Sequence, residues 1–149
     1  MADSQSFDEV SSRSAAALAE QYLALWNESD ADRRRRMIAE LWTEGGRHFL
    51  QPPQEIRGIA AQPGLAIPAI LEARGYEEIE ARAASSYEHW VGSEGLSFRG
   101  RDDADRLGDV VKFHWEAVAK DGDVVAVGLV FLVLAAHGRI ERDYTFVGA

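Results

Sequence analysis

The side chain in this sequence best suited to acid–base chemistry is Asp143, which lies in a predicted C-terminal strand over 140–147. Successive side chains of a strand point to opposite faces, and Thr145 and Val147 share the parity of Asp143. We expect this parity to face the interior. A carboxyl group among apolar side chains is desolvated, which favours its protonated form and suits it to general acid or base work. The alternative is a structural ion pair with a nearby arginine, namely Arg57, Arg139 or Arg142.

The four histidines are scattered and indicate no further reactive centre. His48 and His114 have the parity of the outer sheet face, His137 lies in a predicted turn, and His89 lies off the apolar stripe of a predicted helix. No pair of them has metal-ligand spacing with an acid nearby. The sequence also contains no cysteine, no Ser-His-Asp arrangement, no phosphate loop and no dinucleotide fingerprint. We therefore expect neither a metal nor a cofactor.

Three amphipathic helices are predicted to cover the site. The first is capped by Ser11 or Ser12 and buries a stripe at helical spacing: Ala15, Leu18, Tyr22 and Leu25, widened by Trp26. The second follows a turn over 27–30, is stopped by Gly45-Gly46, and buries Ile38, Leu41 and Trp42. The third spans 76–91.

Strands are predicted at 47–51, 67–72, 96–101, 110–119, 124–134 and 140–147, with a polar hairpin turn over 102–109. The proline- and glycine-rich excursion over 54–75 is the predicted lid or pocket rim. In the strand over 110–119, one apolar set faces the helices: Val111, Phe113, Trp115 and Ala117. The strand over 124–134 is apolar on both faces, and the helices can cover only one. We therefore expect a homodimer through the outer sheet face.

Composition narrows the class of protein. A chain of 149 residues fits one domain with a real core, here predicted over 11–149 after a flexible tail over 1–10. A net charge of −9 argues against nucleic acid and anionic membrane as partners. The basic run from Arg33 to Arg36 is then best explained as a solvated helix face. The N-terminus has no signal-peptide pattern and no apolar run reaches membrane-spanning length, so we expect a cytoplasmic protein.

Several short motifs, in this order, resemble the nuclear-transport-factor-2-like superfamily. Tyr22-Leu-Ala-Leu-Trp26 with Asp30 is similar to the first helix of ketosteroid isomerase, where Tyr22 matches the oxyanion-hole tyrosine. Gln51-Pro52 falls where that family has its base, an aspartate, and Val130 where it has a protonated aspartate. Gln51 cannot take a proton and Val130 cannot form a hydrogen bond, which argues against ketosteroid-isomerase chemistry. The pattern WNE-D-RR-I-LW, together with Trp115, is closer to the actinobacterial SnoaL-like group.

The resemblance implies an α+β fold: a cone-shaped half-barrel whose curved antiparallel sheet is covered on its concave face by about three helices. It implies catalytic roles for Asp143, Tyr22 and Gln51, although Tyr22 could equally be a core tyrosine bonded to a backbone carbonyl. It implies a hydrophobic, substrate-binding pocket lined by Trp26, Phe49, Phe113, Trp115, Val130 and Thr145. The resemblance also implies that the protein is a SnoaL-like cyclase, isomerase, dehydratase or hydrolase acting on a polyketide-, terpenoid- or steroid-like molecule. The alternatives are a non-catalytic binding module and a structural dimer with a filled cone.

Overall fold

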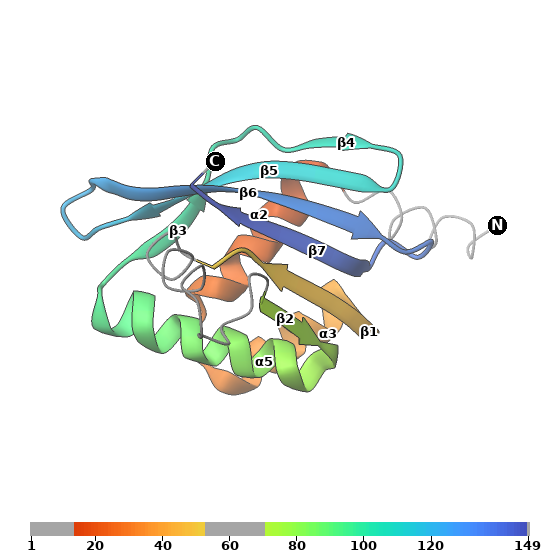
Figure 1. The fold of residues 1–149 in the computed structure, drawn as a ribbon, viewed down its shortest axis with the longest axis horizontal. Coiled ribbons are helices and arrows are strands. Elements are labelled where there is room, and N and C mark those ends of the chain that lie inside the picture. The colour runs from red at the N-terminus through yellow and green to blue at the C-terminus, as the bar shows by residue number, and fades with distance from the viewer. Residues whose placement is uncertain (1–13, 53–70, 149) are drawn as a thin grey trace, which may run out of the picture.

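A curved, unclosed sheet covered on one face by helices makes up the computed structural model, which describes residues 14–52 and 71–148. The helices are α2 (Ala15–Asn27), α3 (Ala31–Leu41) and α5 (Gly75–Ser86), and α5 continues into the π-helix η1 (Tyr87–Ser93). In Figure 1, α5 runs along the lower side of the sheet and α2 passes behind the long strands. This is the predicted α+β cone.

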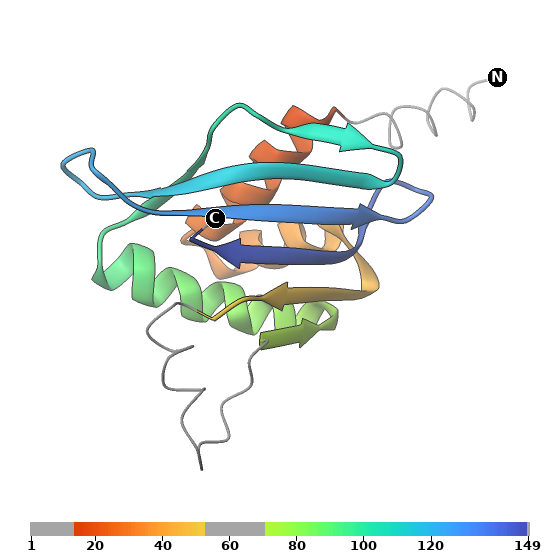
Figure 2. The ribbon, with the colours of Figure 1, turned by 45° about the horizontal axis from the view of Figure 1, so that its top comes forward.

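The sheet has seven strands among the described residues, in the order β2-β1-β7-β6-β5-β3, with β4 also paired to β5. Their bounds are β1 (Trp42–Leu50), β2 (Leu71–Arg74), β3 (Ser97–Gly100), β4 (Asp105–Leu107), β5 (Val110–Val118), β6 (Val124–Leu134) and β7 (Ile140–Val147). Figure 2 shows the long strands side by side. All pairings are antiparallel except that of β1 with β7, which is parallel. This pairing joins residues almost a hundred positions apart in the chain.

The core lies between the concave sheet face and the helices. The alternation predicted for 110–119 is confirmed, since Val111, Phe113, Trp115 and Ala117 are buried while Lys112 is exposed. In β6 the corresponding buried face carries Val130 and Leu132. Helices α2, α3 and α5 contribute Leu18, Leu25, Ile38, Leu41 and Ile79 to the same cluster.

The second helix ends earlier than predicted. It ends at Leu41, and Trp42 begins strand β1, so the prediction that Gly45-Gly46 stops the helix is wrong. A register shift interrupts the β1–β7 pairing between Trp42 and Arg47. A Cβ on Gly46 would lie 2.8 Å from Trp42 Cδ1, so the glycine leaves room for the buried indole within this irregular stretch.

Other boundaries also differ from the sequence prediction, and the short strand predicted over 67–72 lies at Leu71–Arg74 within the described residues. The third helix changes to π geometry at Tyr87 and runs on to Ser93. The predicted turn over 102–109 contains strand β4, and Asp102 adopts a φ of 57° there. Ser14 is the N-cap of α2, accepting a hydrogen bond from the Ala17 amide at 3.0 Å. The predicted caps Ser11 and Ser12, the tail over 1–10 and most of the predicted lid over 54–75 lie outside the described residues.

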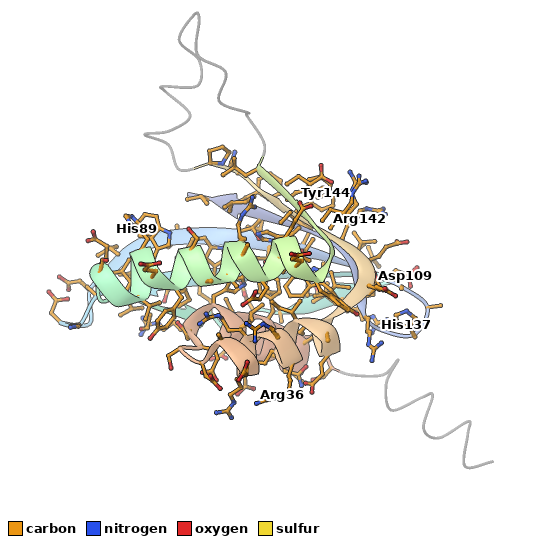
Figure 3. All side chains as sticks on the ribbon, turned by 90° about the horizontal axis from the view of Figure 1, so that it is seen from below. Arg36, His89, Asp109, His137, Arg142 and Tyr144 are labelled. Carbon is orange, nitrogen blue, oxygen red and sulfur yellow. The ribbon has the colours of Figure 1, made fainter. Side chains whose placement is uncertain are left out.

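The basic run of α3 is only partly a solvated face. Arg36 is exposed and Figure 3 shows it at the helix surface. Arg34, in contrast, is buried, and its Nη1 donates to the carbonyl oxygens of Glu28 and Ser29 at 2.8 and 3.0 Å. Arg34 therefore fastens α3 to the turn that follows α2.

Candidate active site

A cavity of about 790 Å³ opens between the concave sheet face and the helices α2, α5 and η1. Its volume lies in the range of small-molecule sites. Apolar side chains form most of its wall, among them Leu23, Trp26, Phe98, Trp115, Val130 and Val147. Few polar groups reach the cavity, and those that are joined by hydrogen bonds lie around Asp143.

Asp143 is completely buried and accepts hydrogen bonds on both carboxylate oxygens. Trp42 Nε1 donates to Oδ1 at 2.9 Å, and the Tyr22 hydroxyl donates to Oδ2 at 2.8 Å. His48 Nδ1 lies 2.7 Å from the same Oδ2. Asp143 points inward, as its parity predicted, and its structural partners are these three rings rather than an arginine.

His48 is the histidine that the parity argument misplaced. It was expected on the outer face, but it is buried and lines the cavity. The parallel pairing of β1 with β7 places His48 directly beside Asp143 in the register. Because Asp143 engages Nδ1, Nε2 is the ring nitrogen left for a ligand. A histidine held in this way by a carboxylate is the usual arrangement of a general base.

Tyr22 connects the acid to the cavity wall. Its hydroxyl donates to Asp143 and lies 2.9 Å from Thr145 Oγ1, so it is not bonded to a backbone carbonyl as a simple core tyrosine would be. Burial, followed by the charge of Asp143, raises the pKa of Tyr22 well above its ordinary value. Tyr22 therefore keeps its proton at neutral pH and acts as a donor rather than a base.

The remaining predicted pocket residues fall into two groups. Trp26, Trp115, Val130 and Thr145 line the cavity, whereas Phe113 packs in the core with its ring 5.6 Å from that of Tyr22.

The predicted parity of strand 47–51 is reversed. Phe49 stacks on Tyr144, with ring centroids 5.0 Å apart, and does not line the cavity. Gln51 is used by the backbone of β7, since its Oε1 accepts from the Val147 amide at 3.1 Å. A slip of one residue exchanges the two faces of a strand, which is why His48 and Leu50 reach the cavity instead.

Sequence reasoning also missed the contribution of the third helix. Arg82, Ser85, Ser86 and His89 all line the cavity, and their spacing of three, four and seven residues places them on one helix face. Figure 3 shows His89 at the η1 end of this helix. The spacing of these four residues is visible in the sequence. The helix was predicted from its apolar stripe alone, so its polar face was overlooked.

The described residues contain neither a metal-binding cluster nor a membrane-spanning helix. Within residues 14–52 and 71–148, no group of three or more histidine or acidic side chains is placed to hold a metal ion. Among the helices in these same ranges, none is long and apolar enough to cross a membrane.

Comparison with solved structures extends over most of the chain. A SnoaL-family protein from Agrobacterium tumefaciens with a provisional isomerase designation matches with 26% identity and a TM-score of 0.69, over 89% of this chain and 95% of that one. An NTF2-like protein of unknown function from Mesorhizobium loti matches with 16% identity and a TM-score of 0.54, over 88% and 93%. A ketosteroid-isomerase-like fold from Catenulispora acidiphila, solved with trimethylamine, matches with 14% identity and a TM-score of 0.56, over 87% and 83%. No protein-family model and no curated protein sequence matches the chain.

The fold and the cavity are those of a cone-shaped α+β protein, and the fold is similar to that of NTF2-like and ketosteroid-isomerase-like proteins. At 26% identity, the chain is also similar to the SnoaL-family protein from Agrobacterium tumefaciens. The fold itself hosts many functions, so any activity has to be argued from the site.

Proposed function

We propose that this protein is a cofactor-independent enzyme that acts by acid–base chemistry on a small, largely apolar molecule. The observation that supports this proposal is the buried His48–Asp143 pair beside an apolar cavity. A structural pair would not need to border a cavity of ligand size. The substrate class in keeping with the apolar wall is a polyketide-, terpenoid- or steroid-like molecule.

In the proposed reaction His48 Nε2 takes a proton from a carbon next to a carbonyl group. The imidazolium that forms is stabilised by Asp143, which stays bonded to Nδ1. His48 then gives a proton to another atom of the substrate, which completes an isomerisation, or to a leaving hydroxyl group, which departs as water and completes a dehydration. In D₂O the Nε2 proton exchanges with solvent, so the substrate that is reprotonated takes up deuterium. Proton transfer by one positioned side chain contributes about 10²–10⁴-fold in rate.

Asp143 becomes a positioning residue in this scheme rather than the group that touches the substrate. Tyr22 and Trp42 hold its two oxygens, so its carboxylate cannot turn away from His48. Thr145 lines the cavity and bonds the Tyr22 hydroxyl, so its own hydroxyl can reach the substrate.

The test uses 2-tetralone, a flat apolar ketone with exchangeable α-hydrogens. The wild-type protein should accelerate deuterium incorporation from D₂O, measured by NMR, and His48→Gln should lose most of that acceleration. His114→Gln is the matched control, because His114 forms a similar pair with Asp103 on the outer side of the sheet, at 2.6 Å. Exchange at the uncatalysed rate with wild-type protein, or full activity in His48→Gln, would contradict the proposal.

The competing function is a non-catalytic binding module, which the cavity alone would support. It predicts that 2-tetralone binds and quenches tryptophan fluorescence without any faster exchange. The same two measurements therefore separate the two functions.

We also propose that the protein forms a homodimer through the outer sheet face. Leu129, Phe131 and Val133 of β6 lie on this face and are only half-buried, and Phe146 of β7 is 42% exposed. The rings of Phe131 and Phe146 meet edge to face at 5.9 Å. Burying such side chains stabilises an interface by roughly 1.5–3 kcal/mol each.

Phe131→Glu tests this interface by light scattering. The variant should give a monomer mass or aggregate, while Ala24→Glu, on the exposed side of α2, should keep the dimer mass. A wild-type protein that is already monomeric, or a Phe131→Glu variant that stays dimeric, would exclude this interface.

A further inference from the structure

The wall of the cavity is chemically divided between the sheet and the third helix. The sheet side is mainly apolar, with Trp115, Val130 and Val147 beside the polar His48 and Thr145. The helix side carries the polar face of α5 and η1 described above, including Arg82 and His89. A ligand with one apolar body and one polar end would match both walls.

Among the described residues of this wall, Arg82 is the only cation that keeps its charge over the whole physiological pH range. Its Nη1 donates a hydrogen bond to the Leu71 carbonyl oxygen at 3.2 Å. Within the described part of the chain, no carboxylate lies in salt-bridge range of its guanidinium, whereas Arg47 and Arg99 are paired with Glu72 and Glu116. Donors of Arg82 are therefore left for a bound anion.

The partial burial of Arg82 makes the binding of an anion to its guanidinium energetically favourable. Desolvation lowers the pKa of Arg82, and the charges of Asp143 and Glu78 only partly oppose that effect. A half-buried guanidinium without a contacting carboxylate gains most from an anion that brings its own charge and two parallel acceptors. A planar carboxylate has this shape.

We propose that the ligand of this cavity carries a carboxylate, which Arg82 binds while the apolar body of the ligand packs against the sheet. This inference rests on the proposed function, because it takes the cavity to be the ligand site, and it adds the class of ligand. Arg82 is a specificity residue in this account. The net charge of −9 opposes non-specific binding of anions, so a preference for an anionic ligand must come from a local cation.

The experiment compares two probes of nearly the same shape, 2-naphthoate and the neutral 2-naphthamide, by calorimetric titration. The wild-type protein should bind 2-naphthoate roughly ten- to a hundredfold more tightly, as expected for hydrogen bonds to a charged group. Arg82→Met should reduce this preference to less than about threefold and leave the affinity for 2-naphthamide unchanged, which also shows that the variant is folded. Arg82→Lys should keep part of the preference.

Arg36→Met is the control, since it removes the same charge from the exposed face of α3. Equal wild-type affinity for the two probes, or a full preference in Arg82→Met, would overturn the inference while leaving the cavity as a binding site. Binding of neither probe would overturn both this inference and the proposed function.

Discussion

Replacing Asp143 with Asn tests how the carboxylate controls His48, because the amide has the same shape but one of its acceptors becomes a donor. Trp42 Nε1 can only donate, so the amide oxygen must stay at the Oδ1 position, 2.9 Å from the indole nitrogen. The amide nitrogen then occupies the Oδ2 position, within 2.8 Å of the Tyr22 hydroxyl and 2.7 Å of His48 Nδ1.

Both of these partners can adapt to a donor. Tyr22 can turn its proton toward Thr145 Oγ1, which is 2.9 Å away, and accept from the amide. His48 can accept at Nδ1 if its proton moves to Nε2. Every buried polar group in the cluster then keeps a partner, so we expect Asp143→Asn to lower the free energy of unfolding by only about 1–3 kcal/mol, the difference between charge-assisted and neutral hydrogen bonds.

The same rearrangement should abolish the base. With its proton on Nε2, His48 presents a donor to the cavity, and the rate of 2-tetralone exchange should fall by about 10²–10⁴. Long-range ¹H–¹⁵N spectra of protein labelled at histidine distinguish the two tautomers directly. We expect Nδ1–H for His48 in the wild-type protein and Nε2–H in the variant.

Asp103→Asn is the matched control, since it alters the outer His114 pair and should change neither the His48 tautomer nor the rate. The reasoning is refuted if Asp143→Asn keeps the Nδ1–H tautomer or the wild-type rate. It is equally refuted if the variant fails to fold, because the compensating hydrogen bonds would then not form.

Two further predictions concern packing and pH. Gly128→Ala should destabilise the protein by about 3 kcal/mol or more in urea unfolding, because the new Cβ would lie 2.2 Å from Trp115 Cε2 and 2.4 Å from the Phe146 carbonyl oxygen. The control Gly45→Ala should be near neutral, because its new Cβ meets nothing within 4 Å. Similar losses of stability in the two variants would contradict this prediction. The raised pKa of Tyr22 contributes stability that is fully present below the unfolded pKa of 10.0 and is lost as the pH rises toward the folded pKa. Tyr22→Phe should therefore flatten the decline of the urea midpoint above pH 10. Parallel curves for the wild-type protein and the variant would contradict this prediction.

The sequence carried enough information to predict the strands that form the sheet wall of the cavity. Alternation in 110–119 correctly placed Phe113 and Trp115 inside, and the parity of Thr145 and Val147 correctly placed Asp143 inward. From Val111 to Ala117 in β5 and from Asp143 to Val147 in β7 the inward positions keep one parity, so a single anchor sets the side chains of each stretch.

The parity of β1 could not be read in the same way. Its parity was predicted from Gln51, which was expected to face inward, whereas the buried residues Trp42, Gly46 and His48 all share the opposite parity. The contact between His48 and Asp143 depends on a parallel pairing that spans 95 positions, and no local pattern encodes it. For this reason the acid was found from the sequence and the base was not.

The most direct test of the central claim, that His48 Nε2 is the reactive group of a ligand cavity, is a crystal structure of the wild-type protein soaked with 2-naphthol. The account predicts the ring between Trp115 and the α5 wall, with its hydroxyl within about 2.6–3.2 Å of His48 Nε2. A naphthol bound elsewhere, or one in the cavity with its hydroxyl turned away from His48, would contradict the account.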